Sequence, residues 1–130
     1  MNYLIGDFAI RIKNSLLARR KKVLLPYSKL NKEVGLVLQK EGLLKSIKEE
    51  VVDGKNILVG EIVFQKRNTQ FIDISIVSKP SLRVYLSLNE IKNRERKKIT
   101  KLILSTNSGI MTGKEAVQKG VGGELLFELF

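Results

Sequence analysis

The 130-residue chain is 43% hydrophobic, and its 24 lysines and arginines against 13 acidic residues give a net charge of +11, an excess that favours nucleic acid, and after it an anionic membrane, as the partner. Neither cysteine nor histidine occurs, which excludes a disulfide framework, an ordinary zinc site and a serine nucleophile activated by histidine. No apolar run approaches ~18 residues and the first residues lack the pattern of a signal peptide, so we expect a globular protein with one moderate core or two small ones and no transmembrane helix.

The first 42 residues predict a helix, a strand and a second helix. Apolar residues recur at helical spacing in two segments, and Ser28 suits the cap at the start of the second helix. The short strand 23–26 ends at Pro26, and Glu41-Gly42 ends the second helix. The two apolar faces that we expect in the core consist of Leu4, Ile5, Phe8, Ile12 and Leu16 in the first helix and Leu30, Val34, Val37 and Leu38 in the second.

Basic residues are concentrated in this first part of the chain. Eight of them, and no acidic residue, lie between Asp7 and Glu33. A basic run is usually a solvated face, but in a chain that already carries +11 an acid-free stretch of this length favours contact with phosphate groups. The polar candidates off the apolar stripe are Arg11, Lys13 and Asn14, followed by the run Arg19, Arg20, Lys21 and Lys22.

Residues 43 to 77 predict three antiparallel strands, which with the two helices make a small α+β unit. The strands 43–52 and 57–64 are joined by Asp53-Gly54, a strong hairpin signal. Residues 71–77 are rich in β-branched side chains and predict the third strand. Before this strand, Lys66 and Arg67 stand in a polar turn, where they either touch RNA or keep the turn soluble.

The stretch 78–85 combines a stiff link with basic and aromatic side chains. Pro80 restricts the backbone between the two halves of the chain, while Lys79 and Arg83 carry positive charge. Tyr85 offers a flat ring and a hydroxyl, and aromatic with basic side chains are the ingredients of RNA contact by stacking. The alternative interpretation is a proline-stiffened turn with a core tyrosine.

The last third predicts short strands and two short helices. Thr112-x-x-Glu115 fits a capping box, Gly120 suits the end of the helix that follows, and Gly122-Gly123 turns the chain into its last strand. The apolar side chains of that strand are expected in the core. The expected elements are a strand over 83–88, a helix or turn over 89–98, a strand over 99–104, a helix from 112 to 120 and a strand over 125–130.

A run of small polar side chains precedes the capping box: Ser105, Thr106, Asn107 and Ser108. They carry donors and acceptors but no charge, which suits contact with base edges and sugar hydroxyls of an irregular RNA. Gly109 permits a positive φ or a close approach to a ligand, and the helix start offers N–H groups to a phosphate. The plainer interpretation is a polar loop that joins a strand to a capped helix.

Gly109 to Lys114 also admits a different class of protein, a nucleotide-binding enzyme. A P-loop requires four residues between its glycines and a serine or threonine after the lysine. Here three residues separate Gly109 from Gly113, and Glu115 follows Lys114. No paired carboxylates suggest a metal site either, so we expect no enzymatic activity, no cofactor, no metal and no small-molecule substrate.

Two stretches of the chain carry a resemblance to a known family. Ser-Thr-x-x-Gly-Ile-Met from Ser105, Ala116 and the Gly-Val-Gly-Gly-Glu that ends at Glu124 resemble the signature of bacterial small-subunit ribosomal protein eight. Ser-Lys-Pro-x-x-Arg-Val-Tyr, ending at Tyr85, is similar to a second stretch of that family, with Ser81 where glycine is usual. The pattern extends from Asp7 to the end of the chain.

The resemblance implies a structural constituent of the small ribosomal subunit that binds the central domain of its rRNA and stabilises that fold during assembly. Small-subunit ribosomal protein five and other neighbouring proteins are the implied partners, in the cytoplasm or in an organelle that encodes the protein itself. A free RNA-binding regulator outside the ribosome stays open as an alternative. The RNA-binding residues expected from the pattern and the resemblance are Arg11, Lys13, Asn14, Lys29, Lys79, Arg83, Tyr85, Ser105, Thr106, Asn107, Ser108, Gly109, Gly122, Gly123 and Glu124, with phosphate contacts from Arg19, Arg20, Lys21, Lys22, Lys66 and Arg67.

The expected fold is α+β, with two small subdomains packed together. Residues 1–66 form the N-terminal subdomain of α-β-α-β-β type. Residues 67–130 form the C-terminal subdomain, mostly antiparallel β with a short helix, which carries the main rRNA-binding loop.

Overall fold

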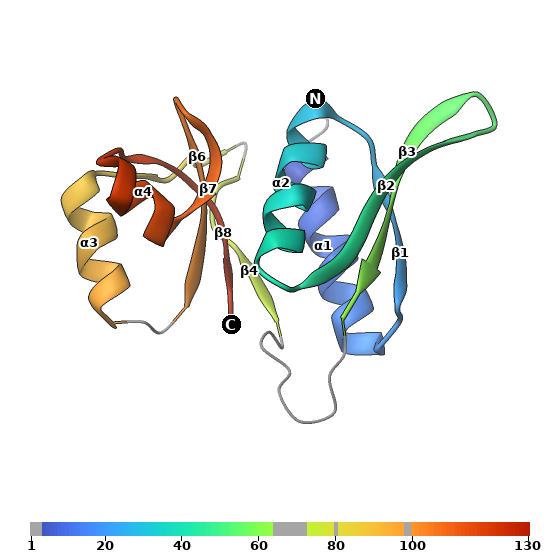
Figure 1. Ribbon diagram of the computed structural model, residues 1–130, viewed down its shortest axis with the longest axis horizontal. Helices are drawn as coiled ribbons and strands as arrows, with labels where there is room; N and C mark the ends of the chain where they lie inside the picture. The colour runs from blue at the N-terminus through green and yellow to red at the C-terminus, as the bar shows by residue number, and fades with distance from the viewer. Residues whose placement is uncertain (1–3, 64–72, 80, 98–99) are drawn as a thin grey trace. The chain divides into compact units, whose positions relative to one another are not determined.

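The computed structural model describes residues 4–63, 73–79, 81–97 and 100–130, and the chain divides into two compact units, Met1–Asp73 and Ile74–Phe130 (Figure 1). The subdomain boundary that we expected between residues 66 and 67 lies outside the described residues. Helices and antiparallel sheets occur in both units, so the predicted α+β class is confirmed.

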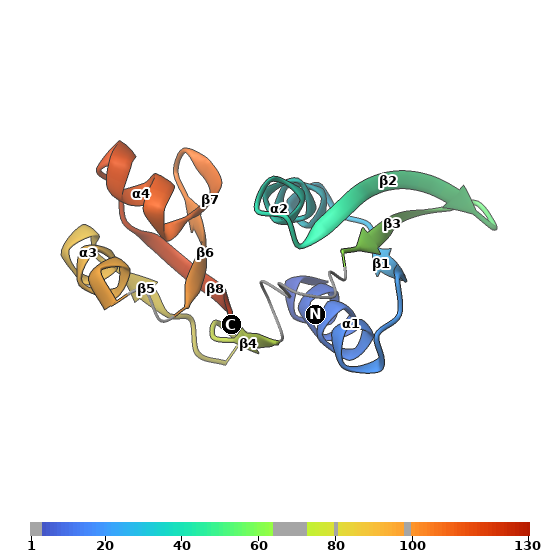
Figure 2. The ribbon, with the colours of Figure 1, turned by 60° about the horizontal axis from the view of Figure 1, so that its bottom comes forward.

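The N-terminal unit contains a three-stranded antiparallel sheet in the order β1-β3-β2. Both of its helices lie on one side of that sheet (Figures 1 and 2). The predicted order of helix, strand, helix and hairpin is confirmed. The elements are α1 (Leu4–Ala18), β1 (Lys22–Pro26), α2 (Lys29–Lys40), β2 (Leu44–Val52) and β3 (Lys55–Ile62).

Local signals in the sequence set the ends of these elements. The Ser28 hydroxyl accepts a hydrogen bond from the Asn31 N–H (3.0 Å) and caps α2, which ends at Glu41 as predicted. Asp53 and Gly54 have φ of 52° and 75°, the left-handed conformation that a two-residue hairpin requires. Val52 and Lys55 are paired on either side of this turn.

One expected core position in α2 was wrong. Leu30 is 39% exposed, whereas Asn31 is fully buried. Asn31, Val34 and Leu38 are three and four residues apart, so they share one face of the helix, and Leu30 is turned away from it. In α1 the expected core residues Ile5, Phe8, Ile12 and Leu16 are all buried.

The C-terminal unit contains a five-stranded antiparallel sheet in the order β4-β8-β6-β7, with β5 also paired to β8. One face of this sheet packs against two helices through a core of Leu86, Ile91, Leu102, Leu104, Met111, Ala116 and Leu125. The elements are β4 (Ile74–Ile76), β5 (Tyr85–Leu86), α3 (Leu88–Lys97), β6 (Lys101–Thr106), β7 (Gly109–Thr112), α4 (Gly113–Lys119) and β8 (Gly123–Leu129).

The strand expected over 71–77 does not complete the N-terminal sheet. Its described part is β4, which pairs with β8 in the second sheet, and β1 takes the third place in the first. An apolar run specifies a strand but not its partner. Val23 and Leu25 are buried at alternate positions of β1, and β1 is the third strand of the first sheet instead.

One further segment differs from the prediction. The strand expected over 83–88 is limited to Tyr85–Leu86, because Leu88 already begins α3. The Ser87 hydroxyl accepts from the Glu90 N–H (3.3 Å) and the Glu90 carboxylate accepts from the Ser87 N–H (3.4 Å), a capping box that starts this helix.

Candidate nucleic-acid interface

Four strands of the second sheet place side chains in one row. Tyr85 pairs with Glu124, Glu124 with Ser105, and Ser105 with Ile110. Directly opposed residues of antiparallel strands project from the same face, here the face opposite to the core residues Leu104 and Leu125. Tyr85, Ser105 and Glu124, which are far apart in the chain, are therefore neighbours in the sheet.

Tyr85 is the exposed member of this row. Its residue surface is 68% exposed, which excludes the alternative of a core tyrosine, while the other three members are half-buried. A flat ring held at the surface of a sheet suits stacking with an RNA base.

Glu124 forms an ion pair with Arg83, with 3.2 Å between Oε2 and Nη1. The Glu124 side chain is 14% exposed and that of Arg83 is 40% exposed. The guanidinium neutralises the carboxylate, so Glu124 does not repel phosphate as a lone carboxylate would. The carboxylate in turn holds Arg83 beside Tyr85.

Ser78 positions the segment that carries Arg83 and leads into β5 at Tyr85. This serine is fully buried, and its hydroxyl accepts a hydrogen bond from the Val84 N–H (3.0 Å). Lys79 and Leu82 exchange backbone hydrogen bonds of 3.0 Å each, which closes the turn between them. From the sequence, Pro80 was expected to restrict the backbone of this segment, but Pro80 lies outside the described residues. A single serine in the sequence does not indicate that its hydroxyl will bond the backbone.

The expected polar loop is a tight hairpin between β6 and β7. Ser105 and Thr106 belong to β6, and only Asn107 and Ser108 form the turn. The Thr106 hydroxyl accepts from the Ser108 N–H (3.1 Å) and donates to the Gly109 carbonyl (2.9 Å). Thr106 therefore builds the turn, whereas the exposed Asn107 and Ser108 side chains are presented by it.

Gly109 and the pair Gly122-Gly123 are required by the backbone. Gly109 has φ of 109°, which side chains rarely allow. A Cβ on Gly122 would lie 2.6 Å from the Leu86 carbonyl oxygen, and one on Gly123 would lie 2.5 Å from that of Ser105. The two glycines thus let the start of β8 approach both neighbouring strands, which brings the row together.

The start of α4 is capped by the side chains of Thr112 and Glu115. Thr112 accepts from the Glu115 N–H (3.3 Å), so the predicted N-cap is confirmed, while the Glu115 carboxylate accepts from the Thr112 hydroxyl (3.3 Å). Thr112 and Gly113 are buried, and the Glu115 carboxylate occupies this helix end. The Glu115 N–H, one of the groups that we expected to be free for a phosphate, is therefore bonded within the cap.

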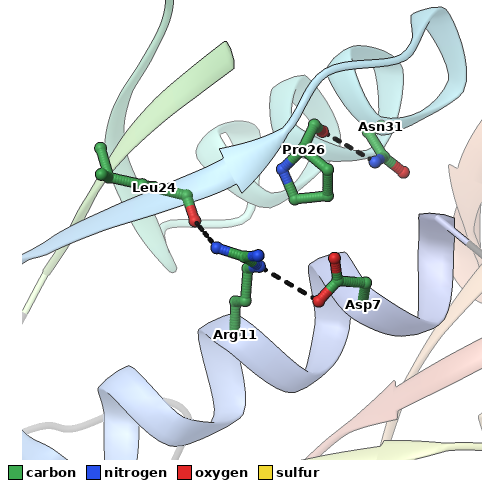
Figure 3. Close-up of polar contacts among 5 residues, drawn as sticks. All are labelled: Asp7, Arg11, Leu24, Pro26 and Asn31. Carbon is green, nitrogen blue, oxygen red and sulfur yellow. Dashed lines mark hydrogen bonds and ion pairs between the residues drawn. The ribbon is translucent and has the colours of Figure 1, made fainter.

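Arg11 ties α1 to β1 (Figure 3). Its Nη1 donates to the Leu24 carbonyl (3.3 Å) and its Nε pairs with Asp7 (3.1 Å). Asn31, which the sequence reading passed over, donates from Nδ2 to the Pro26 carbonyl (2.9 Å), so both helices are bonded to β1. The sequence feature that could have indicated this role is an amide side chain on the apolar face of α2.

The remaining candidates of the N-terminal unit are solvent-accessible cations and amides. Lys13 approaches Asp73, with 3.8 Å between charged atoms, and Asn14 is exposed. Lys66 and Arg67 lie outside the described residues. The other predicted basic contacts are exposed: Arg19, Arg20 and Lys21 between α1 and β1, Lys22 at the start of β1, Lys29 at the start of α2 and, in the second unit, Lys79.

Within the described ranges, no group of three or more acidic residues is arranged to hold a metal ion. No helix in that part of the chain is long and apolar enough to cross a bilayer.

Comparison with protein families decides the assignment. The model of the family described as Ribosomal protein S8 matches residues 4–130. The chain belongs to the ribosomal protein S8 family. The predicted family is thereby confirmed.

Relatives of the S8 family match over nearly their full length. The small ribosomal subunit protein uS8 of Acidobacterium capsulatum is 38% identical over 127 residues, which cover 97% of this chain and 96% of that protein. The protein of the same name from Trichormus variabilis is 39% identical over 127 residues, covering 96% and 95% of the two chains. That of Caldanaerobacter subterraneus is 40% identical over 124 residues, covering 94% and 92%.

Membership of the S8 family identifies a ribosomal, rRNA-binding protein of translation and not an enzyme. The expectation of a non-enzymatic protein is confirmed by this assignment. It also discards the nucleotide-binding enzyme that Gly109 to Lys114 had left open.

Proposed function

We propose that this chain is a structural constituent of the small ribosomal subunit, which binds the central domain of the subunit's rRNA and stabilises that RNA fold during assembly. The relatives named above are small-subunit proteins. The observation that supports direct RNA recognition is the row in which Tyr85 and the Arg83–Glu124 pair lie beside Ser105.

Specificity comes from the C-terminal unit. Asn107 and Ser108 project at the hairpin turn next to the row, and their groups donate and accept without charge. Tyr85 stacks on an unpaired base while these groups contact base edges and sugars, which requires an irregular RNA rather than a regular duplex. A hydrogen-bonded turn and a paired sheet present both contacts, which limits the order that is lost on binding.

Affinity comes from cations that contact phosphates and release counterions. Exposed cations of the N-terminal unit include the run 19–22 and Lys29, and Asn14 adds an uncharged donor. In the C-terminal unit the exposed Lys79 contributes charge, whereas the charge of Arg83 is balanced by Glu124. A neighbouring small-subunit protein, protein five, contacts the bound chain in the assembled subunit, in the cytoplasm or in an organelle.

A salt titration tests this function. Binding of the full chain to a central-domain rRNA helix is compared with binding to an unrelated duplex of equal length. We expect cognate binding to persist at salt concentrations where the control no longer binds, because base and shape contacts are less salt-dependent than phosphate contacts. Equal affinities with equal salt slopes would contradict specific recognition.

A further inference from the structure

A second candidate site lies in the C-terminal unit, between the end of α3 and the end of β8. A surface hollow of about 390 Å³ is lined by Arg94, Lys97, Thr100, Glu128 and Phe130. None of these residues belongs to the row at Tyr85.

The hollow and the row are at opposite ends of the β6–β8 pair. The row contains Ser105 opposite Glu124, whereas Lys101 is opposite Leu129 and Leu102 is opposite Glu128 at the other end. Four residues of strand separate these ends, or roughly 13 Å. Leu102 belongs to the core beneath the helices, so Glu128 projects from the helix-covered face, and the row occupies the other face.

Charge and shape in the hollow suit a nucleotide. Arg94 Nη1 and Glu128 Oε1 form an ion pair of 2.6 Å, which orients the guanidinium. Lys97 makes no ion pair with any described residue, and the stretch 88–101 contains six basic and two acidic residues. Phe130 is 46% exposed and offers an aromatic surface next to these cations.

A simpler role accounts for part of this pattern. Basic residues in the last turn of a helix stabilise its negative end, and α3 has Arg94, Arg96 and Lys97 there. That role applies to Arg96 as much as to Lys97. It does not account for the exposed ring of Phe130 or for the hollow that Lys97 lines and Arg96 does not.

We propose that this hollow binds one unpaired nucleotide of RNA, with the base against Phe130, the phosphate on Lys97 and the Thr100 hydroxyl within reach of the sugar-phosphate backbone. Aromatic stacking with a neighbouring cation is a common mode of single-strand binding. The inference rests on the RNA-binding role of the protein and adds a contact that takes single-stranded RNA, apart from the row.

The test is an NMR titration of the isotope-labelled full chain with a short oligouridylate, and separately with inorganic tripolyphosphate, which has charge but no base. We expect the oligouridylate to shift the amide signals of Lys97, Thr100 and Phe130, and tripolyphosphate to leave Phe130 unshifted. Phe130→Leu keeps an apolar side chain without the flat ring and should weaken oligouridylate binding about tenfold.

Arg96→Gln is the matched control for Lys97→Gln, because each removes one positive charge from the same helical turn. Lys97→Gln should weaken oligouridylate binding more than Arg96→Gln does. Equal losses in these two variants, or unchanged binding in Phe130→Leu, would overturn the site. Binding of the cognate rRNA helix by the same variants reports on the row, so failure of the hollow is distinguishable from failure of the proposed function.

Discussion

The Thr106 hydroxyl is predicted to stabilise the β6–β7 turn rather than to read RNA. Thr106→Val keeps the shape of the side chain and removes both hydrogen bonds, to the Ser108 N–H and to the Gly109 carbonyl. Each is worth about 0.5–1.5 kcal/mol, for a sum of ~1–3 kcal/mol. Because Ser108 is exposed, water partly replaces the hydrogen bond that its N–H loses in the variant. We therefore expect the free energy of unfolding to fall by ~1 kcal/mol.

The assay pairs urea denaturation with RNA binding for three variants. Thr106→Ser retains the hydroxyl and should recover most of the stability that Thr106→Val loses. Ser108→Ala is the control for recognition, because the Ser108 hydroxyl has no hydrogen bond to any described residue. It should change stability by less than ~0.5 kcal/mol and weaken cognate binding by about 1–2 kcal/mol.

Three results would refute this division of roles. A Ser108→Ala variant as unstable as Thr106→Val would make Ser108 part of the turn rather than of the RNA contact. A Thr106→Ser variant as unstable as Thr106→Val would show that the methyl group, and not the hydroxyl, supports the turn. Finally, if Ser108→Ala weakened binding to an unrelated duplex by the same amount, the turn would not read RNA.

Two further changes test the backbone of the row and the source of affinity. Gly123→Ala places a Cβ 2.5 Å from the Ser105 carbonyl oxygen and should lower the free energy of unfolding by about 1–3 kcal/mol. Thermal unfolding measures this loss, and a variant as stable as the wild type would mean that β8 shifts freely. Replacing Arg19, Arg20, Lys21 and Lys22 with glutamine should make RNA binding less dependent on salt. The slope of log K against log salt concentration should become less steep by roughly 0.7–0.9 for each phosphate that the variant no longer neutralises. An unchanged slope would show that this run is only solvated.

Glu124 illustrates why the site was only partly predictable. Its place in the signature indicated the RNA-binding region but did not identify the partner of its charge. That partner is Arg83, 41 residues earlier, and the two meet because β5 pairs with β8. The glycines before Glu124 were interpreted as a turn, whereas they also allow the close approach of β8 to Leu86 and Ser105.

The sequence by itself determined the features whose causes are local. The N-caps at Ser28 and Thr112, the Asp53-Gly54 turn and the apolar face of α1 each depend on residues within a few positions of one another. Tertiary structure alone decided which sheet β4 joins and why Asn31, rather than Leu30, is buried. Strand pairing and burial depend on partners far along the chain, and local propensity has no information about those partners.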